Sequence, residues 1–286
     1  MQRITKDHII KDLRNLNINK GDILFITIDI LKVGYFENNR QETLSNWINI
    51  LLDLVGKEGA IIFAAYTKLS LIFSNKKTVF HRYSETITGS LPNFLINHPN
   101  SIRSSHPTHS VIAIGEKVRK IIEKHNHNTS TYSIMGDLIN LPNCKFIMIG
   151  TIDKKNAPQA MHYAQEVLGY TKKTLFKYLF KSHYFINHKQ KLFIKKDFGG
   201  CSRGAYKLFS NLILDDSVNF FYVGKAKTAV MDPKKSFITI KTILQKDRNY
   251  IYCDNIDCID CNGVLSYKFY YGMLNKIIAF LKLNNS

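Results

Sequence analysis

One histidine has neighbours that suit proton transfer. His162 lies in the string Met161-His162-Tyr-Ala-Gln165-Glu166, and residues three and four positions further along a helix share its face. Gln165 or Glu166 could therefore orient the imidazole, and a carboxylate would also raise its basicity. An imidazole titrates near pH ~6.5, so it can accept a proton at neutral pH. A purely structural His–Glu pair on a helix is the alternative.

A second polar string precedes the apolar stretch that begins at Val111. It reads Arg103-Ser104-Ser-His106-Pro-Thr-His109-Ser110. Two histidines three apart could bind a metal, but no carboxylate or thiol is adjacent and the proline stiffens the turn. Loop anchoring is the simpler role, although a string this long and specific is unusual for a plain connector.

The five cysteines are the remaining candidates for chemistry. Cys258-Ile-Asp-Cys261 has metal-knuckle spacing and Cys253 is near, but no second such pair or pair of histidines adjoins it. We therefore expect no metal site. Cys144 and Cys201 have no histidine nearby in the sequence, so an acyl-cysteine mechanism is disfavoured.

Alternating strand and helix patterns over residues 1–150 must position these side chains. Thr5 is a suitable N-cap for the first helix, and Gly56 ends the second. Two consecutive β-α-β patterns favour an α/β fold with a largely parallel sheet covered on both faces. Strands are expected at 23–28, 60–65, 111–114 and 146–149, and helices after Thr5 and at about 41–55, 116–125 and 135–141.

His162 follows the strand that ends before Gly150. Asn156 can cap a helix and Pro158 can open it, which puts the imidazole in the first turns. That position is the edge of the sheet where doubly wound folds bind ligands.

The character of the chain changes after Gly169. Residues 167–196 contain no Asp or Glu but carry eight lysines. We expect a turn at 197–200, a helix near 203–214, strands within 220–230 and at 250–253, and a packed C-terminal helix at about 264–283. This predicts a smaller, β-containing C-terminal part.

Composition excludes several classes of protein. The 286 residues are 45% hydrophobic and 22% charged, which is typical of a folded globular chain. The longest apolar run, Ala60 to Tyr66, is too short to span a membrane, and residues 1–12 alternate charged and apolar side chains, so we expect no signal sequence there. We expect a cytoplasmic protein. The net charge of +18 attracts anions, from phosphate-bearing cofactors to nucleic acid, although a general composition bias towards lysine is an alternative explanation.

Several strings, in order, resemble the aminoglycoside 3-N-acetyltransferase family, also called the antibiotic N-acetyltransferases. The resemblance is close over about residues 5–175 and looser beyond them, through Tyr222-Val-Gly224-Lys-Ala226. The Arg-Ser-x-His-Pro-x-His-Ser string is its most specific part. The other matching strings are Gly21-Asp-Ile-Leu, Val33-Gly34, Leu51-Leu-Asp-Leu-Val-Gly-Lys-Glu-Gly59, Ala65-Tyr-Thr67, Ile147-Met-Ile-Gly150 and Met161-His162-Tyr-Ala.

The resemblance implies a metal-free, acetyl-CoA-dependent N-acetyltransferase with a mixed sheet between helical layers. It makes His162 the catalytic histidine and puts Thr67 near the thioester. The residues expected to contact the coenzyme are Asp29, Ile30, Ala65, Arg103, Ser104, His109, Ser110 and Val111.

Three departures from the family pattern affect the site. Thr27-Ile-Asp29 stands where a His-Ser-type run is usual, so backbone contacts would replace side-chain contacts there. The family's acidic residue three positions after the histidine is Gln165 here, and we expect Glu166 to replace it. The loop between Gly150 and His162 is about two residues longer, which suggests an altered acceptor pocket.

We therefore predict direct acetyl transfer with His162 as general base, oriented by Glu166, and with a Thr67 or Ser110 hydroxyl as an oxyanion donor. The chain is expected to be one domain, with a catalytic core at 1–170 and a basic, acceptor-side part at 171–286. Because that part is cationic, we expect a nucleotide-linked amino sugar as the acceptor, with an antibiotic aminoglycoside as the alternative.

A non-catalytic nucleic-acid-binding protein is the alternative from another class, but no recognition motif supports it. A monomer or a homodimer is expected.

Overall fold

A seven-stranded mixed sheet is the framework of the protein, seen in a computed structural model that describes residues 4–172, 174, 176 and 178–266. Its strand order is β4-β5-β2-β1-β6-β10-β9. The parallel pairings are β2 with β1 and β1 with β6, and antiparallel strands extend both sides. The strands are β1 (Ile23–Ile28), β2 (Ala60–Ala64), β4 (Ile102–Arg103), β5 (Val111–Ile114), β6 (Cys144–Ile149), β9 (Val218–Val223) and β10 (Ala226–Met231).

Strand β1 shows why both faces of the sheet are covered. Its successive side chains point to opposite faces. Ile23 and Phe25 belong to one buried cluster, whereas Leu24 and Ile26 belong to the other. All four are at most 2% exposed, so helices must pack on both sides. The expected mixed sheet between helical layers is confirmed.

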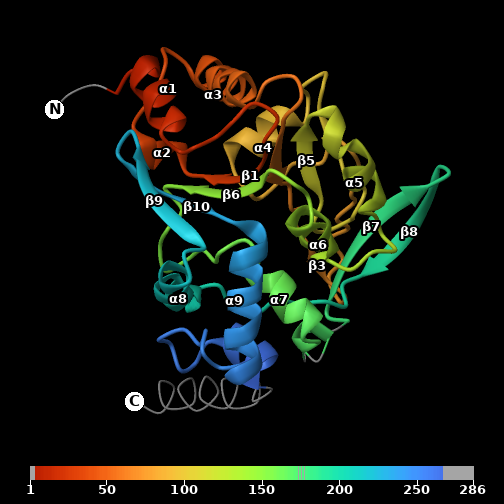
Figure 1. Ribbon diagram of the computed structural model, residues 1–286. Coiled ribbons are helices and arrows are strands. Elements are labelled where there is room, and N and C mark those ends of the chain that lie inside the picture. Colours follow the sequence, from red (N-terminus) through yellow and green to blue (C-terminus); the bar gives the residue numbers. More distant parts are fainter. Residues whose placement is uncertain (1–3, 173, 175, 177, 267–286) are drawn as a thin grey trace, which may run out of the picture.

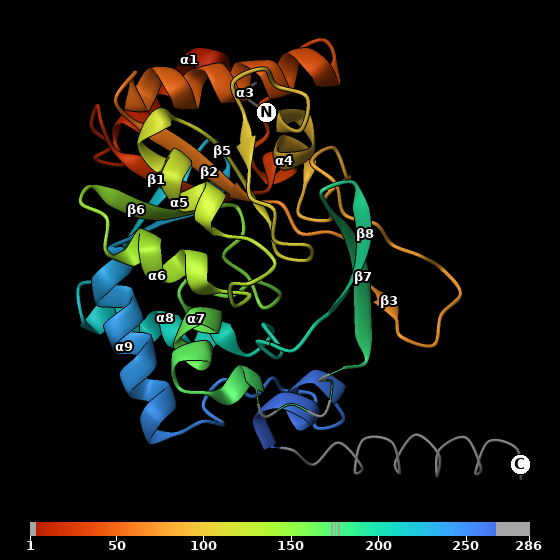
Figure 2. The ribbon, with the colours of Figure 1, turned by 90° about the vertical axis from the view of Figure 1, so that its right-hand side faces the viewer.

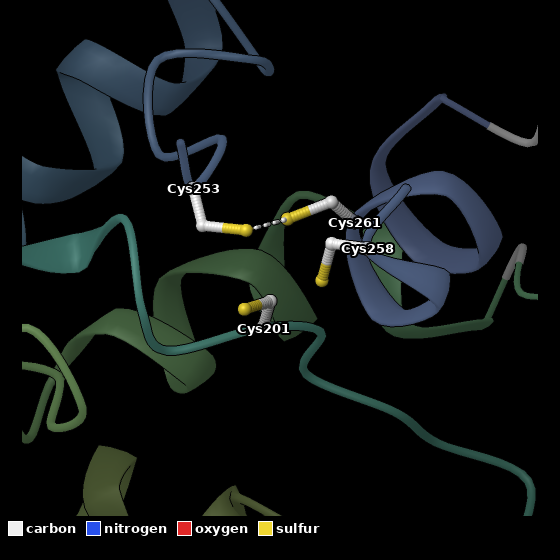
Figure 3. Close-up of side chains that lie close together, drawn as sticks. All are labelled: Cys201, Cys253, Cys258 and Cys261. Atoms are coloured by element: carbon white, nitrogen blue, oxygen red, sulfur yellow. Dashed lines mark hydrogen bonds between the residues drawn. The ribbon is translucent and has the colours of Figure 1, made fainter. Parts of the chain in front are cut away.

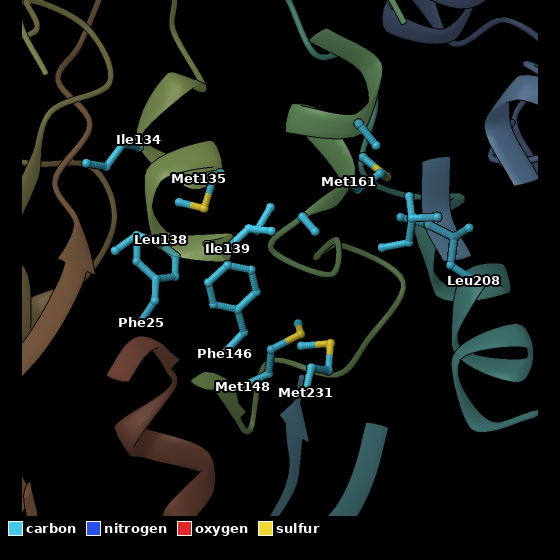
Figure 4. Close-up of a cluster of buried hydrophobic side chains, with 14 of the residues drawn as sticks. Phe25, Ile134, Met135, Leu138, Ile139, Phe146, Met148, Met161, Leu208 and Met231 are labelled. Carbon is cyan, nitrogen blue, oxygen red and sulfur yellow. The ribbon is translucent and has the colours of Figure 1, made fainter. Parts of the chain in front are cut away.

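The two helical layers are drawn on opposite sides of the sheet in Figures 1 and 2. One layer contains α1 (Lys6–Arg14), α2 (Ile30–Val33), α3 (Arg40–Val55) and α4 (Ser90–Leu95). The other contains α5 (Arg119–Lys124), α6 (Ser133–Ile139), α7 (Met161–Val167), α8 (Leu208–Leu214) and α9 (Pro233–Lys246). Short 3-10 turns lie at Glu116–Val118, Tyr170–Lys172 and Ala205–Lys207. Figure 4 shows Phe25 and Phe146 from the sheet packed against Leu138 and Ile139 of α6.

Helix caps explain several boundaries. The Thr5 side chain accepts a hydrogen bond from the His8 N–H, which confirms the expected N-cap of α1. Asn39 caps α3 through the Glu42 N–H. Helix α9 was not expected, although Asp232 and Pro233 form a cap and first-turn signal before it.

A second sheet of three strands stands beside the first and contains much of the basic segment. It pairs β3 (Ser70–Leu71) with β7 (Phe180–Ile186) and β7 with β8 (Lys189–Ile194). Figure 2 shows the β7–β8 hairpin extending along one side of the molecule. Strands from both halves of the chain therefore share each sheet, and the functional division at residue 170 stays a prediction.

Two expectations for the C-terminal part need comment. The strand expected at 250–253 is wrong, because these residues form a turn whose Tyr252 carbonyl accepts a hydrogen bond from Lys207 Nζ at 2.6 Å. A π-helical turn occupies Cys261–Ser266. The rest of the helix expected at 264–283 lies outside the described residues. Within the described part of the chain, no helix is long and apolar enough to cross a membrane.

Replacing Phe146 with alanine should destabilise the protein by about 3 to 5 kcal/mol, because this ring is fully buried at the centre of the sheet and its loss leaves a cavity. The same replacement at Phe73, which is 87% exposed, is the matched control and should change stability by less than about 0.5 kcal/mol. Urea unfolding measures both free energies. Equal losses in the two variants would contradict the described core.

Candidate active site

A cavity of 940 Å³ opens where the central parallel strands end. Its walls include the last residues of β1 and β2, the starts of α3 and α4, the loop 156–159 and the His162 side chain. This is the carboxyl edge of the parallel strands, where α/β folds bind ligands. His162 therefore has an open route to a bound molecule.

His162 lies in the first turn of α7, as expected. The predicted Asn156 cap is wrong, however, because α7 begins at Met161 without a side-chain cap. The Asn156 amide instead donates to Asp153 Oδ1 at 2.9 Å, within a turn that precedes the helix.

Two hydrogen bonds fix the tautomer of the His162 ring. Its Nδ1 lies 2.9 Å from Gln165 Oε1 and 3.0 Å from the Gly199 carbonyl oxygen. A carbonyl oxygen can only accept, so Nδ1 carries the proton. The lone pair is then on Nε2, which lies 3.2 Å from the Ser202 hydroxyl. His162 and Ser202 both line the cavity, so the site presents a basic nitrogen to it.

Glu166 does not contact His162, contrary to the prediction that it orients the ring. Its carboxylate accepts hydrogen bonds from the Ser130 hydroxyl at 2.7 Å and from the Tyr132 N–H at 3.0 Å. The Tyr132 ring in turn stacks on the imidazole, with centroids 5.2 Å apart. Glu166 therefore acts on His162 only through Tyr132, and the direct partner on the helix is Gln165.

The loop at Gly199 approaches His162 too closely for any side chain. A Cβ atom at position 199 would lie 2.1 Å from His162 Nδ1. The Gly199 N–H also donates to the Tyr132 hydroxyl at 3.1 Å. This hydrogen bond holds the loop next to Tyr132, whose ring stacks on the imidazole. The adjacent glycines at 199 and 200 predict a turn but not its contact with the histidine. The sequence alone does not identify Gly199, Ser202 or Tyr132 as partners of His162.

Burial lowers the pKa of His162 below its usual 6.5. Hydrogen bonds to Gln165 and Gly199 oppose this shift, and the nearby Lys195 cation adds to it. The imidazole is therefore neutral at pH 7 and available as a base.

The string that begins at Arg103 forms a network of mostly buried hydrogen bonds. The Arg103 guanidinium donates to the Ala65 carbonyl at 3.0 Å and to the Ser110 hydroxyl at 3.1 Å, and Ser110 donates to the same carbonyl at 2.6 Å. The Ser104 hydroxyl accepts from the Val111 N–H at 2.9 Å. Burial lowers the pKa of Arg103 to about 10, so it stays charged at neutral pH.

The expected oxyanion donors have other partners. The Thr67 hydroxyl donates to the Pro107 carbonyl at 2.8 Å and is buried, as is Ser110. The His109 ring packs against Tyr66 at a tilt of 38°, with centroids 4.3 Å apart, and its Nε2 lies 3.4 Å from Lys195 Nζ.

Of the residues expected to bind the coenzyme, Asp29 and Ile30 line the cavity. The lining residues do not include the other six, nor Thr67. These six are Ala65, Arg103, Ser104, His109, Ser110 and Val111.

None of the described residues of the basic segment lines the cavity. Charged side chains in the described lining are Asp29, Glu37 and Arg40, so two carboxylates face one guanidinium. Lys189 and Lys191 are exposed on the β7–β8 hairpin and contribute charge to the surface, whereas Lys195 is buried beside His109.

Two helices start at the wall of the same cavity. The cavity wall includes Asn39 and Arg40 at the start of α3. It also includes Gly89 and Ser90 at the start of α4. Backbone N–H groups at a helix start attract phosphate through hydrogen bonding and the helix dipole.

The family model for aminoglycoside 3-N-acetyltransferase matches residues 26–237. A structure of AAC-VIa bound to sisomicin is similar, with a TM-score of 0.70 and 17% identity over 86% of this chain and 99% of that one. AAC-IIIb with CoASH has a TM-score of 0.69 and 18% identity, covering 85% of this chain and 97% of that one.

YokD from Bacillus subtilis has a TM-score of 0.68 and 16% identity, covering 85% and 100% of the two chains. At these identities the structural similarity shows a shared fold. No curated protein sequence matches the chain.

The tautomer assignment can be tested by NMR. At neutral pH the nitrogen shifts of His162, assigned by comparison with His162→Gln, should show a protonated Nδ1 and an unprotonated Nε2. The ring should titrate with a midpoint below 6.5, because burial disfavours the charged form. A proton on Nε2, or a midpoint at or above 6.5, would contradict the described site.

Proposed function

Because the chain belongs to the aminoglycoside 3-N-acetyltransferase family, we propose that it acetylates an amine of an aminoglycoside by direct transfer from acetyl-CoA, with His162 as general base. The observation that carries this proposal is the unprotonated Nε2 of His162, which faces the cavity while the Gly199 carbonyl holds the proton on Nδ1.

The imidazole has two tasks in this reaction. Its Nε2 takes the proton that the acceptor amine loses as the new N–C bond forms, and the imidazolium returns a proton to the sulfur as the C–S bond breaks. Positive charge on the ring is stabilised because Nδ1–H points at the Gly199 carbonyl and the Gln165 amide oxygen. A general base of this kind contributes roughly 10² to 10⁴ in rate.

Acetyl-CoA is the proposed acetyl donor. It supplies the thioester, and its phosphates suit the N–H groups at the starts of α3 and α4. Asp29 and Ile30, at the start of the short helix α2, line the cavity nearby.

The acceptor follows from the charge of the cavity lining. Asp29 and Glu37 line the cavity, and their carboxylates attract a polycationic sugar. The described residues of the basic segment, on which the expectation of a nucleotide-linked acceptor rests, are not among the lining residues. Similarity in fold to a protein solved with sisomicin also supports an aminoglycoside over the nucleotide-linked sugar.

Acceptor choice can be measured as thiol release from acetyl-CoA. Sisomicin and gentamicin should be acetylated, and nucleotide-linked amino sugars should react at least tenfold more slowly. Glu37→Gln should raise the KM for sisomicin several-fold because it removes a carboxylate from the cavity. Glu58→Gln is the matched control, since Glu58 is exposed and outside the lining. Turnover of nucleotide-linked sugars alone would overturn this acceptor assignment.

A covalent route through Ser202 is the mechanistic alternative, because its hydroxyl lies within hydrogen-bonding distance of the base. Direct transfer predicts that Ser202→Ala keeps kcat within about tenfold of the unmodified protein, while His162→Gln loses roughly 10² to 10⁴. Comparable losses in both variants, with ping-pong kinetics and an acetyl group trapped on the protein, would replace direct transfer by an acyl-serine mechanism.

A further inference from the structure

Four of the five cysteines meet at one point beside the active-site loop. Cys201 comes from that loop, Cys253 from the turn that follows α9, and Cys258 and Cys261 from the next turn. Their sulfur atoms all lie within 4.8 Å of one another. Figure 3 shows the four side chains pointing toward a common centre. Three of the four residues are buried, and Cys253 is partly buried.

The spacing of the sulfurs fits a tetrahedral metal site. A zinc ion bound to four thiolates at about 2.3 Å requires sulfur–sulfur distances of about 3.8 Å. Cys253 Sγ and Cys261 Sγ are 3.6 Å apart. A disulfide needs about 2.05 Å, and all four thiols are free.

We propose that Cys201, Cys253, Cys258 and Cys261 bind one structural zinc ion. Four thiolates in a tetrahedral arrangement select zinc or iron among the common metals. Four protein ligands also leave no open position, so the ion would have a structural role and no part in acetyl transfer.

The surrounding backbone is arranged to bring these cysteines together. A Cβ atom at Gly204 would lie 2.1 Å from the Ile251 carbonyl oxygen, so only glycine allows the loop to approach the segment that carries Cys253. Lys207 Nζ binds the Tyr252 carbonyl at 2.6 Å, which ties the same segments together. The Arg203 N–H donates to Cys201 Sγ at 3.3 Å, a bond that stabilises a thiolate.

The proposed ion would act on the catalytic base through the loop. Cys201 comes two positions after Gly199, whose carbonyl binds His162 Nδ1, and directly before Ser202, whose hydroxyl lies 3.2 Å from Nε2. Anchoring Cys201 to the turn at Cys258–Cys261 would therefore hold both partners of the imidazole. This proposal departs from the expectation of a metal-free protein, which rested on the spacing of cysteines close in sequence and on the family resemblance.

The full-length protein, purified without added metal, should contain about one zinc per chain by elemental analysis. Replacement of zinc by Co²⁺ should give the visible absorption of tetrahedral thiolate coordination. Cys201→Ser and Cys258→Ser should each lose at least tenfold in zinc content. Cys144→Ser is the matched control, because Cys144 is a buried cysteine on β6 outside the cluster, and it should keep one zinc.

The wild-type measurements decide the question even if a variant fails to fold. Less than about 0.1 zinc per chain with five titratable thiols, a stoichiometric amount of iron, or disulfides within the cluster would each overturn the proposal. Loss of zinc from the Cys144→Ser control would also overturn the ligand assignment. None of these readouts depends on acetyltransferase activity, so the metal site and the proposed reaction are tested separately.

Discussion

The hydrogen bond between His162 Nδ1 and the Gly199 carbonyl is the constraint on which the site depends. It fixes the proton on one ring nitrogen and leaves the other as a base. The bond requires the absence of a side chain at position 199, because a Cβ there would overlap the ring. It also requires α7 to begin at the edge of the sheet, so that the imidazole projects into the cavity.

The charge of the protein is arranged differently on its surface and in its cavity. The chain carries a net charge of +18, yet two carboxylates and one guanidinium are the charged groups of the described cavity lining. The lysines of the β7–β8 hairpin therefore contribute to the surface. Net charge alone would suggest an anionic partner, but a ligand in the cavity responds mainly to the charges closest to it.

The polar string at residues 103–110 does not line the cavity but binds the segment that follows β2. Arg103 and Ser110 both bind the Ala65 carbonyl, and Thr67 binds the Pro107 carbonyl. Buried polar groups need such partners, since each unpaired group costs about 1 to 3 kcal/mol. A specific sequence can therefore reflect the demands of a buried hydrogen-bond network as well as contact with a ligand.

The sequence by itself determined four strands of the larger sheet, most helices and the position of His162 at the sheet edge, because periodic burial and capping are local properties. The strands expected at 23–28 and 111–114 have the observed bounds. Only the tertiary structure decided which groups contact that histidine and which cysteines meet. Gly199 is 3.0 Å from His162, and Cys201 is within 4.8 Å of Cys253, because separate segments pack together. Such contacts depend on the path of the whole backbone, and local spacing does not contain that information.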